Sequence, residues 1–388
     1  MKIAFVTDYD PDDVLQWSGL GFFIRKSLLD QGVEVISIGP LLNSMESKIL
    51  FRLYFKTKKY IIEKIFKKIY IIDHDIVFSW LQSMSAWKKI KKIRNIDAIF
   101  SLGANQSAFI PQGIPLITCS DATHHSLFST HNYYKRISRS TLYHANKIQS
   151  ISLKRASKSI FSSDWASRSA LDYYGGNAQK IVTIPFGANL FNEPTSEDVV
   201  ESIKNRSRES INLIYIGVEW ERKGGAFVME VLGELLKSTK KLNLMIFGCS
   251  PTIPIELKRY VTVEGFVSKT DANSYKIYDS LSKSHFLIVP SQAECYGLVY
   301  AEASAFGVPS IAKNVGGVSS VVRNNINGYA FEPDSKPDLV ANYIIESHSN
   351  NNKYDELARS ARELYETTLN WNVAGKHLVK VIQEAISA

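Results

Sequence analysis

Short apolar runs alternate with helical patterns along the whole chain, and this alternation strongly limits the folds that it can adopt. The runs IAFVTDY, VEVISIG, DAIFSLG, IPLITCS and SIFSS have strand character, and FFIRKSLLDQG, between the first two, has helical periodicity and a terminal glycine. Apolar runs separated by helices are typical of parallel strands buried on both faces. The sequence therefore predicts an α/β fold of parallel sheets covered by helices.

The same pattern starts a second time in the middle of the chain. It resumes at INLIYIG, after the polar stretch NEPTSEDVVESIKNRSRES. A chain of 388 residues exceeds what one core normally supports, and its 45% apolar residues can fill two cores. We interpret residues 191–210 as a linker and predict domains at 1–195 and 196–370, followed by a helix at 371–388.

Cysteine usage and the N-terminus indicate a cellular compartment. Cys119, Cys249 and Cys295 lie far apart, in no metal-binding or CxxC spacing, as expected of reduced thiols. The start MKIAFVTDYD is too short and too acidic for a signal peptide, and no apolar run approaches the length of a transmembrane helix. We expect a cytoplasmic protein that is either soluble or peripheral at the inner face of the cell membrane.

Positive charge is concentrated in the first half of the chain. Residues 1–190 contain 25 lysines and arginines against 14 acidic residues, whereas the remainder contains 21 against 24. The segment KILFRLYFKTKKYIIEKIFKKIYII interleaves bulky apolar residues with lysines, as helices on anionic lipid do. A buried helix with a basic solvent face is the alternative. We find no nucleic-acid-binding motif and expect no nucleic-acid partner.

Two glutamates, Glu294 and Glu302, are separated by CYGLVYA. The segment reads as a strand, a tight loop and a helix that opens near Gly297, with the first carboxylate just before the helix and the second two turns inside it. The unpaired N–H groups of a helix start favour a phosphate group, and the flanking carboxylates can bind sugar or ribose hydroxyls. Alternatively, Glu302 is a residue of the helix surface.

The surrounding motifs resemble those of the retaining glycosyltransferases of family 4, which carry a Glu-x7-Glu motif. The likeness is strongest over IYIGVEWERKGG, VEGFVS, VPSQAECYGLVYAEASAFGVPSIA, NVGGVSSVV and NGYAFEP. It implies the GT-B fold, in which two Rossmann-like, doubly wound parallel-sheet domains face a central cleft. The first domain would bind the acceptor and the second the nucleotide sugar, and the last helix would pack back on the first domain.

The resemblance also implies an activity. We expect a retaining, metal-independent, hexosyltransferase-type enzyme that moves a sugar from a nucleotide diphosphate sugar to a hydroxyl of a lipid-linked saccharide acceptor, in polysaccharide, lipopolysaccharide or glycolipid assembly. The nucleotide base stays open, and no cofactor is expected. One alternative is a GT-B sugar-nucleotide epimerase or phosphorylase, which phosphate-dependent, acceptor-free turnover would reveal. The other is a catalytically silent nucleotide-binding scaffold, which the intact glutamate pair disfavours.

Particular residues receive roles through this resemblance. Glu294 would contact the donor sugar, Glu302 the ribose hydroxyls, and Lys223 the diphosphate, where a cation stabilises the leaving group. Asp121 matches a family aspartate and is the third predicted catalytic residue, with Glu294 and Lys223. The other predicted donor-binding positions are Tyr296, Gly297, Leu298, Val299, Gly187, Gly217 and Arg222.

Two positions depart from the family pattern. Val218 stands where an arginine is usual, and Arg222 is its nearest substitute, unless Arg222 is simply a solvated surface residue. Ser120 stands where a histidine is usual, which His124 or His125 could replace, although neighbouring loop histidines are commonly solvated.

The first strand is followed by a candidate ligand loop. Gly19 and Gly21, in QWSGLG, allow the backbone to approach an acceptor or phosphate closely. Asp10, Asp12 and Asp13, in DYDPDD, superficially match a metal-binding triplet, but they lie in the acceptor domain. We interpret them as loop carboxylates and predict no metal site.

Overall fold

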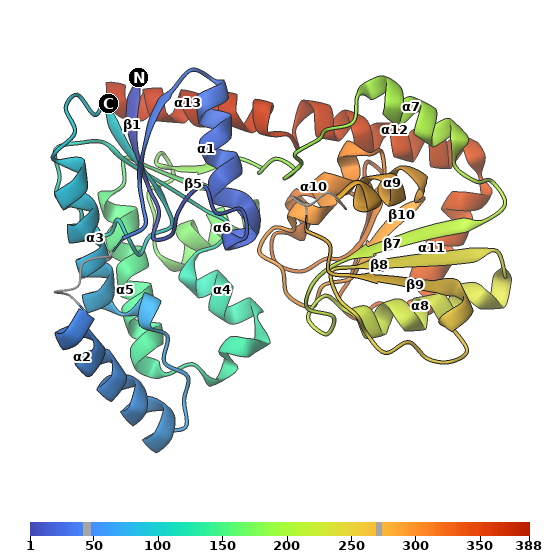
Figure 1. Cartoon of the computed structure of the whole chain (residues 1–388), viewed down its shortest axis with the longest axis horizontal. Helices are drawn as coiled ribbons and strands as arrows, with labels where there is room; N and C mark the ends of the chain where they lie inside the picture. The colour runs from blue at the N-terminus through green and yellow to red at the C-terminus, as the bar shows by residue number, and fades with distance from the viewer. Residues whose placement is uncertain (42–47, 269–273) are drawn as a thin grey trace. The chain divides into compact units, whose positions relative to one another are not determined.

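The computed structural model describes residues 1–41, 48–268 and 274–388 (Figure 1). The chain forms two compact units. The N-terminal unit comprises Met1–Pro185 and Ala374–Ala388, and the C-terminal unit comprises Phe186–Val373. Each unit is built on one six-stranded sheet whose strand pairs are all parallel, as the alternating pattern of the sequence predicts.

The N-terminal sheet has the strand order β2-β1-β3-β4-β5-β6. Its strands are β1 (Lys2–Val6), β2 (Glu34–Ile38), β3 (Ala98–Leu102), β4 (Leu116–Ser120), β5 (Lys158–Phe161) and β6 (Ile181–Thr183). Its helices are α1 (Leu20–Asp30), α2 (Lys48–Tyr60), α3 (Ile76–Ile90), α4 (His124–Thr130), α5 (Arg139–Arg155), α6 (Asp164–Arg168) and most of α13 (Trp371–Ser387). Figure 1 shows α1 and α3 on opposite sides of this sheet, and successive residues of β1 are accordingly all buried from Ile3 to Val6.

The basic amphipathic segment forms α2 and a π-helical turn, Ile61–Ile65. Phe55, Ile62 and Tyr70 are buried together, whereas Leu53 and Phe66 are 70% and 65% exposed. The segment is therefore neither a buried helix nor one that exposes all of its apolar residues.

A buried carboxylate fixes α2 to its neighbours. Asp75, which is fully buried, forms an ion pair with Lys58 of α2, accepts a hydrogen bond of 2.7 Å from Tyr70 and lies 3.2 Å from Nδ1 of His144 in α5. Burial alone would raise the pKa of Asp75, but these hydrogen bonds and the Lys58 charge outweigh it and lower the pKa. Lys58 is therefore a structural cation, unlike the exposed lysines around it.

The C-terminal sheet has the strand order β12-β11-β10-β7-β8-β9. Its strands are β7 (Ile211–Ile216), β8 (Leu242–Phe247), β9 (Val261–Gly265), β10 (Phe286–Val289), β11 (Ser310–Lys313) and β12 (Gly328–Phe331). Its helices are α7 (Ser196–Asn205), α8 (Gly225–Ser238), α9 (Tyr275–Lys283), α10 (Leu298–Ala305), α11 (Pro337–Ser349) and α12 (Asn351–Thr367). Because β7 and β10 are paired neighbours, the loops at their carboxyl ends lie side by side.

The polar stretch at 191–210 is not a linker, which corrects the sequence interpretation. It contains α7, which Thr195 caps through the backbone N–H of Asp198, and whose Val199 and Ile203 are buried in the C-terminal unit. Because only these two positions of α7 are buried, its other positions face solvent and most of them are polar, which makes the sequence resemble a linker. The units divide after Pro185 and Val373, not at the predicted 195 and 370.

Trp371 anchors the beginning of α13 within the C-terminal unit. Its Nε1 donates a hydrogen bond of 2.8 Å to the side chain of Asn189, and its ring stacks on Phe186 with centroids 5.8 Å apart. The missing side chain of Gly187 makes room for this arrangement, because a Cβ there would lie 2.4 Å from the Trp371 nitrogen. Among the described helices, none is long and apolar enough to cross a membrane.

Candidate functional site

The loops after β7 and β10 bring Lys223 and Glu294 together. Nζ of Lys223 forms an ion pair with a carboxylate oxygen of Glu294, although 71 residues separate them in the chain. Both side chains are largely withdrawn from solvent, with 14% and 12% exposed. Ser291 donates a further hydrogen bond of 3.1 Å to the same carboxylate. Two residues that the sequence predicts to act on one ligand are therefore in direct contact.

The charges around Glu294 keep it ionised. Burial alone would raise its pKa, but the adjacent Lys223, the more distant charge of Arg222 and the hydrogen bond from Ser291 outweigh burial and lower the pKa below its usual value. At neutral pH the site thus contains a fixed carboxylate beside a fixed ammonium group. Such a pair can bind a polyhydroxyl group and a phosphate at adjacent positions.

The helix start between the two glutamates is as the sequence predicts. Gly297 precedes α10 with a φ of 93°, in the left-handed region that favours glycine, and no side chain caps the helix. The first N–H groups of α10, which begin at Leu298 and Val299, have no partner within the helix. They offer an anion the positive end of the helix dipole, next to Glu294.

Gly316 supports Glu294 from the loop after β11, and the sequence reasoning did not single it out. Its φ is 57°, and a Cβ there would lie 1.8 Å from the carbonyl oxygen of Glu294. The neighbouring Gly317 N–H donates to that same oxygen at 3.3 Å. The only signal was the pair of glycines in NVGG, which is part of a family-like motif but carries no reactive group.

Glu302 is 4% exposed in the second turn of α10. The alternative that it is a surface residue is therefore wrong. Tyr296 is also buried, and its hydroxyl donates a hydrogen bond of 2.8 Å to the carbonyl of Phe186, so its side chain serves packing. Gly217 allows the Lys223 stem to pass closely, because a Cβ there would lie 3.1 Å from Cγ of Lys223.

Arg222 contacts the loop that carries Glu294. Its Nη1 donates to the carbonyl of Ala293 at 3.1 Å, and its Nε pairs with Glu219. The side chain is about one third exposed, whereas Val218 is 64% exposed. Arg222 is thus a held cation next to the site, not a freely solvated residue.

The candidate ligand loop of the N-terminal unit has an unusual backbone. Trp17 and Ser18 have φ values of 45° and 55°, a conformation that costs non-glycine residues about 1–3 kcal/mol each, and Gly19 follows with 80°. The indole N–H of Trp17 donates to the carboxylate of Asp121 at 3.3 Å. The structure therefore brings this loop to Asp121, which directly follows β4 as predicted.

His124 and His125 begin α4 and are not loop residues. His124 is buried, its Nδ1 lies 2.7 Å from the carbonyl of Ala145, and its ring lies 4.6 Å from that of His74. Burial lowers the pKa of His124 to about 4, so the ring is neutral at physiological pH. His125 stacks on Tyr173 at 3.5 Å. The expectation that neighbouring histidines are solvated is thus wrong for His124.

Three of the four aspartates of DYDPDD, namely Asp10, Asp12 and Asp13, lie in a turn. Asp10 and Asp13 accept backbone hydrogen bonds from Asp12 and Leu15, each of 3.0 Å, and Asp12 forms an ion pair with Arg25 at 2.7 Å. Within residues 1–41, 48–268 and 274–388, no group of three or more histidines, cysteines or carboxylates is placed to hold a metal ion.

Residues 200–364 match the family described as Glycosyl transferases group 1. Among curated relatives, an uncharacterized 41.2 kDa protein in the cps region of Klebsiella pneumoniae is 25% identical over 205 residues, which are 52% of this chain and 54% of that protein. An uncharacterized glycosyltransferase of Methanocaldococcus jannaschii is 27% identical over 208 residues, 47% of this chain and 55% of that protein. The chain thus spans about half the length of the curated relatives it matches.

Two solved structures match almost the entire chain. A glycosyltransferase from Rickettsia africae has a TM-score of 0.66 and 18% identity, covering 99% of this chain and 98% of its own. The Anabaena protein HepE, solved in complex with UDP-glucose, has a TM-score of 0.61 and 15% identity, covering 99% and 100%. The chain therefore has the GT-B fold, and its residues 200–364 match the glycosyl transferases group 1 family.

Proposed function

We propose that this protein is a retaining glycosyltransferase that moves a sugar from a nucleotide diphosphate sugar to a hydroxyl of a lipid-linked saccharide. The ion pair between Lys223 and Glu294, beside the open start of α10, is the observation that carries the proposal. It places a cation, a carboxylate and backbone N–H groups around one position. In a sugar attached to a diphosphate, the sugar hydroxyls complement the carboxylate, and the adjoining diphosphate complements the cation and the N–H groups.

In the proposed reaction, the bond between the anomeric carbon and the β-phosphate oxygen breaks, and negative charge gathers on the departing diphosphate. Lys223 and the N–H groups of α10 stabilise that charge. Glu294 contacts the ring hydroxyls and stabilises the oxocarbenium-like sugar. The acceptor hydroxyl attacks from the face that the phosphate leaves, and the phosphate takes its proton, so no separate protein base is required. Glu302 holds the ribose.

The donor class has independent support. HepE, which shares the fold, was solved with UDP-glucose. The relative from the cps region of Klebsiella pneumoniae matches about half of the chain. The excess of positive charge in residues 1–190 fits an enzyme that takes part in polysaccharide or glycolipid assembly at an anionic membrane.

A donor screen followed by product analysis tests the reaction. Thermal shift against a panel of sugar nucleotides identifies the donor, and NMR of the product on a lipid-linked acceptor gives the anomeric configuration. Transfer with the configuration of the donor is the expected result. An inverted product would overturn retention, acceptor-free turnover that depends on phosphate would indicate a phosphorylase, and binding without turnover would indicate a scaffold.

We place the acceptor-binding surface at an anionic membrane through α2 and the residues after it. Leu53, Tyr60, Ile65 and Phe66 are exposed there among lysines, and Figure 1 shows α2 at the margin of the N-terminal unit, away from its sheet. Exposed apolar residues supply insertion, and each nearby lysine adds about 1 kcal/mol of attraction to anionic lipid. Phe55, which the sequence groups with them, is buried and supplies no insertion.

Vesicle co-sedimentation tests this placement. The variant replaces five exposed lysines by glutamine and leaves Lys58 intact, because Lys58 pairs with buried Asp75. The replaced residues are Lys56, Lys59, Lys64, Lys67 and Lys68. We expect a sharp loss of binding to anionic vesicles and a larger loss of activity on a lipid-linked acceptor than on a soluble one.

A matched control removes the same charge from the C-terminal unit, at Lys204, Lys237, Lys258, Lys283 and Lys353, all of which are exposed. It should bind vesicles as the parent protein does. Equal binding by the parent and the first variant, at low and moderate salt, would contradict a membrane role for the segment.

A further inference from the structure

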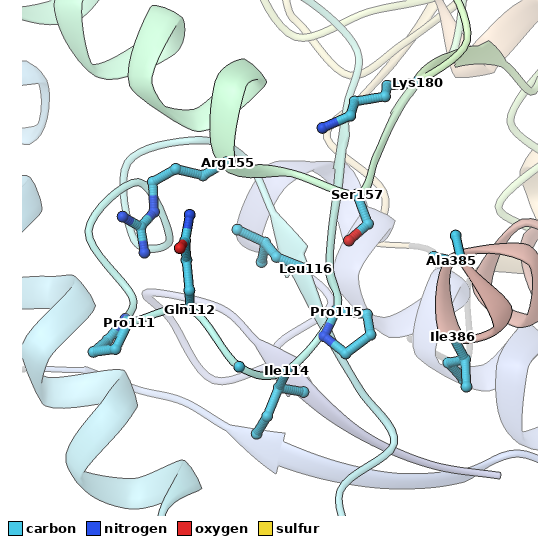
Figure 2. A pocket seen from close by; sticks show the side chains of 12 residues that line it. Pro111, Gln112, Ile114, Pro115, Leu116, Arg155, Ser157, Lys180, Ala385 and Ile386 are labelled. Atoms are coloured by element: carbon cyan, nitrogen blue, oxygen red, sulfur yellow. The ribbon is translucent and has the colours of Figure 1, made fainter.

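A hollow lies in the N-terminal unit (Figure 2). Its walls are residues 111–116, which lead into β4, together with Arg155, Ser157 and Lys180, which precede β5 and β6. It therefore lies at the amino ends of strands, whereas the candidate ligand loop and Asp121 follow the carboxyl ends. Its volume of about 430 Å³ is within the range of small-molecule sites.

The hollow is cationic. Arg155 and Lys180 line it, and none of the described lining residues has an acidic side chain. Nη2 of Arg155 donates to the carbonyl of Ile110, and Nζ of Lys180 donates to the carbonyl of Ala156 at 3.1 Å. Both cations thus donate to backbone carbonyl oxygens and not to acidic side chains.

One donor of the Arg155 side chain lacks a partner. Nε of Arg155 is buried, and no described group accepts a hydrogen bond from it. An unsatisfied buried donor costs free energy, most of all on a charged group. Because Nε itself is withdrawn from solvent, a ligand in the hollow would meet the terminal N–H groups of the guanidinium. Lys180 has two further N–H donors for the same ligand.

The remaining wall is partly polar and partly apolar. In Figure 2 the side chains of Arg155 and Gln112 lie on one side of the hollow and those of Ser157 and Lys180 on the other, with Leu116 between the two pairs. Ile114, with Ile386 at the end of α13, lines the other part. A guanidinium, an ammonium, an amide and a hydroxyl offer more donors than the two oxygens of a carboxylate can use. The three peripheral oxygens of a phosphate monoester suit them better.

We propose that this hollow binds a phosphorylated ligand with an apolar body. The phosphoryl group lies between Arg155 and Lys180, and the apolar body lies against Ile114 and Ile386. A lipid phosphate and a soluble phosphate ester share this chemistry. The site is distinct from the Lys223–Glu294 pair and does not depend on the proposed transfer reaction.

Calorimetric titration with phenyl phosphate tests the site. Because phosphates can also bind at the donor site, the parent for all titrations carries Lys223→Gln. We expect saturable binding by this parent and a loss of affinity of about tenfold or more in Lys180→Gln and in Arg155→Gln, each of which removes a charged donor. Lys158→Gln is the matched control, because Lys158 is a neighbouring lysine that is paired with Glu384 and does not line the hollow.

Arg155 also holds the carbonyl of Ile110, so thermal melting accompanies each titration, and Lys180→Gln carries the test if Arg155→Gln unfolds. Equal affinity of the parent, Lys180→Gln and Lys158→Gln would overturn the proposal. Absence of binding by the Lys223→Gln parent up to about 10 mM phenyl phosphate would also overturn the proposal. A dissociation constant above that concentration is weaker than that of a usual functional site.

Two further ligands identify the apolar contribution and the source. Inorganic phosphate should bind more weakly than phenyl phosphate, and Ile114→Ala should reduce that difference. Equal affinity for both ligands would overturn the apolar part of the proposal. A short-chain phosphatidic acid that binds more tightly than phenyl phosphate would assign the site to a lipid, and the reverse order would assign it to a soluble ester.

Discussion

The loops after the strands of the two units differ in the charged groups that they hold. In the C-terminal unit, Lys223 and Glu294 are both ionised and in contact, and Arg222 lies on the same loop. In the N-terminal unit, His124 is neutral and buried, and Asp121 accepts a hydrogen bond from Trp17. One edge therefore holds a pair of fixed opposite charges, and the other holds a neutral imidazole and a carboxylate that accepts a hydrogen bond from an indole.

This difference matches the division of labour that we propose. A diphosphate leaving group requires fixed charges that are already oriented before the bond breaks. A saccharide acceptor presents only neutral hydroxyls at its reacting end, and charged groups would have to be desolvated to bind it. The comparison therefore predicts that removing charge damages catalysis most in the C-terminal unit.

The largest expected effect follows from Glu294→Gln. This change removes the charge that stabilises the sugar in the transition state but keeps the shape of the side chain, so we expect turnover to fall about a hundredfold or more. The affinity for the nucleotide diphosphate should change little, which calorimetry checks. Glu221→Gln, which alters an exposed carboxylate nearby, is the control. A comparable loss of nucleotide affinity in Glu294→Gln would contradict the separation of sugar and phosphate contacts.

Glu302→Ala should have the opposite signature. If Glu302 holds the ribose, its removal costs a charge-assisted hydrogen bond, about 1.5–3 kcal/mol of nucleotide affinity. Because the residue is buried, Glu302→Gln serves as a volume-matched variant, and thermal melting checks that both variants fold. An unchanged affinity for the nucleotide diphosphate in both variants would remove Glu302 from the site.

The sequence predicts the secondary structure and the helix start of the site well, because both depend on residues that are close together in the chain. The α/β alternation and the helix start at Gly297 depend on periodicity and on a strand, glycine and helix that are contiguous in the chain. The contact between Lys223 and Glu294 depends on the pairing of β7 with β10, which no spacing reveals. The support from Gly316 likewise depends on a loop folded over Glu294.

Burial was the weaker part of the prediction. Within one amphipathic segment, Phe55 is buried and Phe66 is exposed, although both are phenylalanines among lysines. The residues that cover Phe55, such as Tyr70, come from later in the chain and are not visible in local periodicity. The polar helix α7 was taken for a linker for the same reason: its partners are distant in sequence.

A smaller effect concerns the neutral side of the comparison. His124 has a folded-state pKa of about 4, below the ordinary value of about 6.5, so the unfolded chain binds more protons between these values. The stability from His124 is complete above pH 6.5 and is lost as the pH falls toward 4. Between pH 6 and 5 this loss should be on the order of 1 kcal/mol.

Denaturant titrations of the parent and of His124→Gln at these pH values measure this contribution. The variant should be less stable at pH 7 and should show a shallower decline with acid. His377, an exposed histidine on α13, provides the control substitution His377→Gln. An equal decline in the parent and His124→Gln would indicate that His124 is not held neutral.

The smallest expected effect is that of a chelator. If Lys223 and the start of α10 stabilise the diphosphate, EDTA should leave turnover within about twofold, because a fixed ammonium and backbone N–H groups take the place of a divalent cation. Asp10, Asp12 and Asp13 of DYDPDD are the candidate metal ligands that could contradict this expectation. Asp10 and Asp13 accept hydrogen bonds from their own turn, and Asp12 is paired with Arg25, so a cation there would have to compete with that arginine.

Abolition of activity by EDTA, with rescue by Mg²⁺ or Mn²⁺, would contradict the prediction. Loss of that rescue in Asp12→Asn would then assign the metal to the turn, and the N-terminal unit would carry charge chemistry of its own.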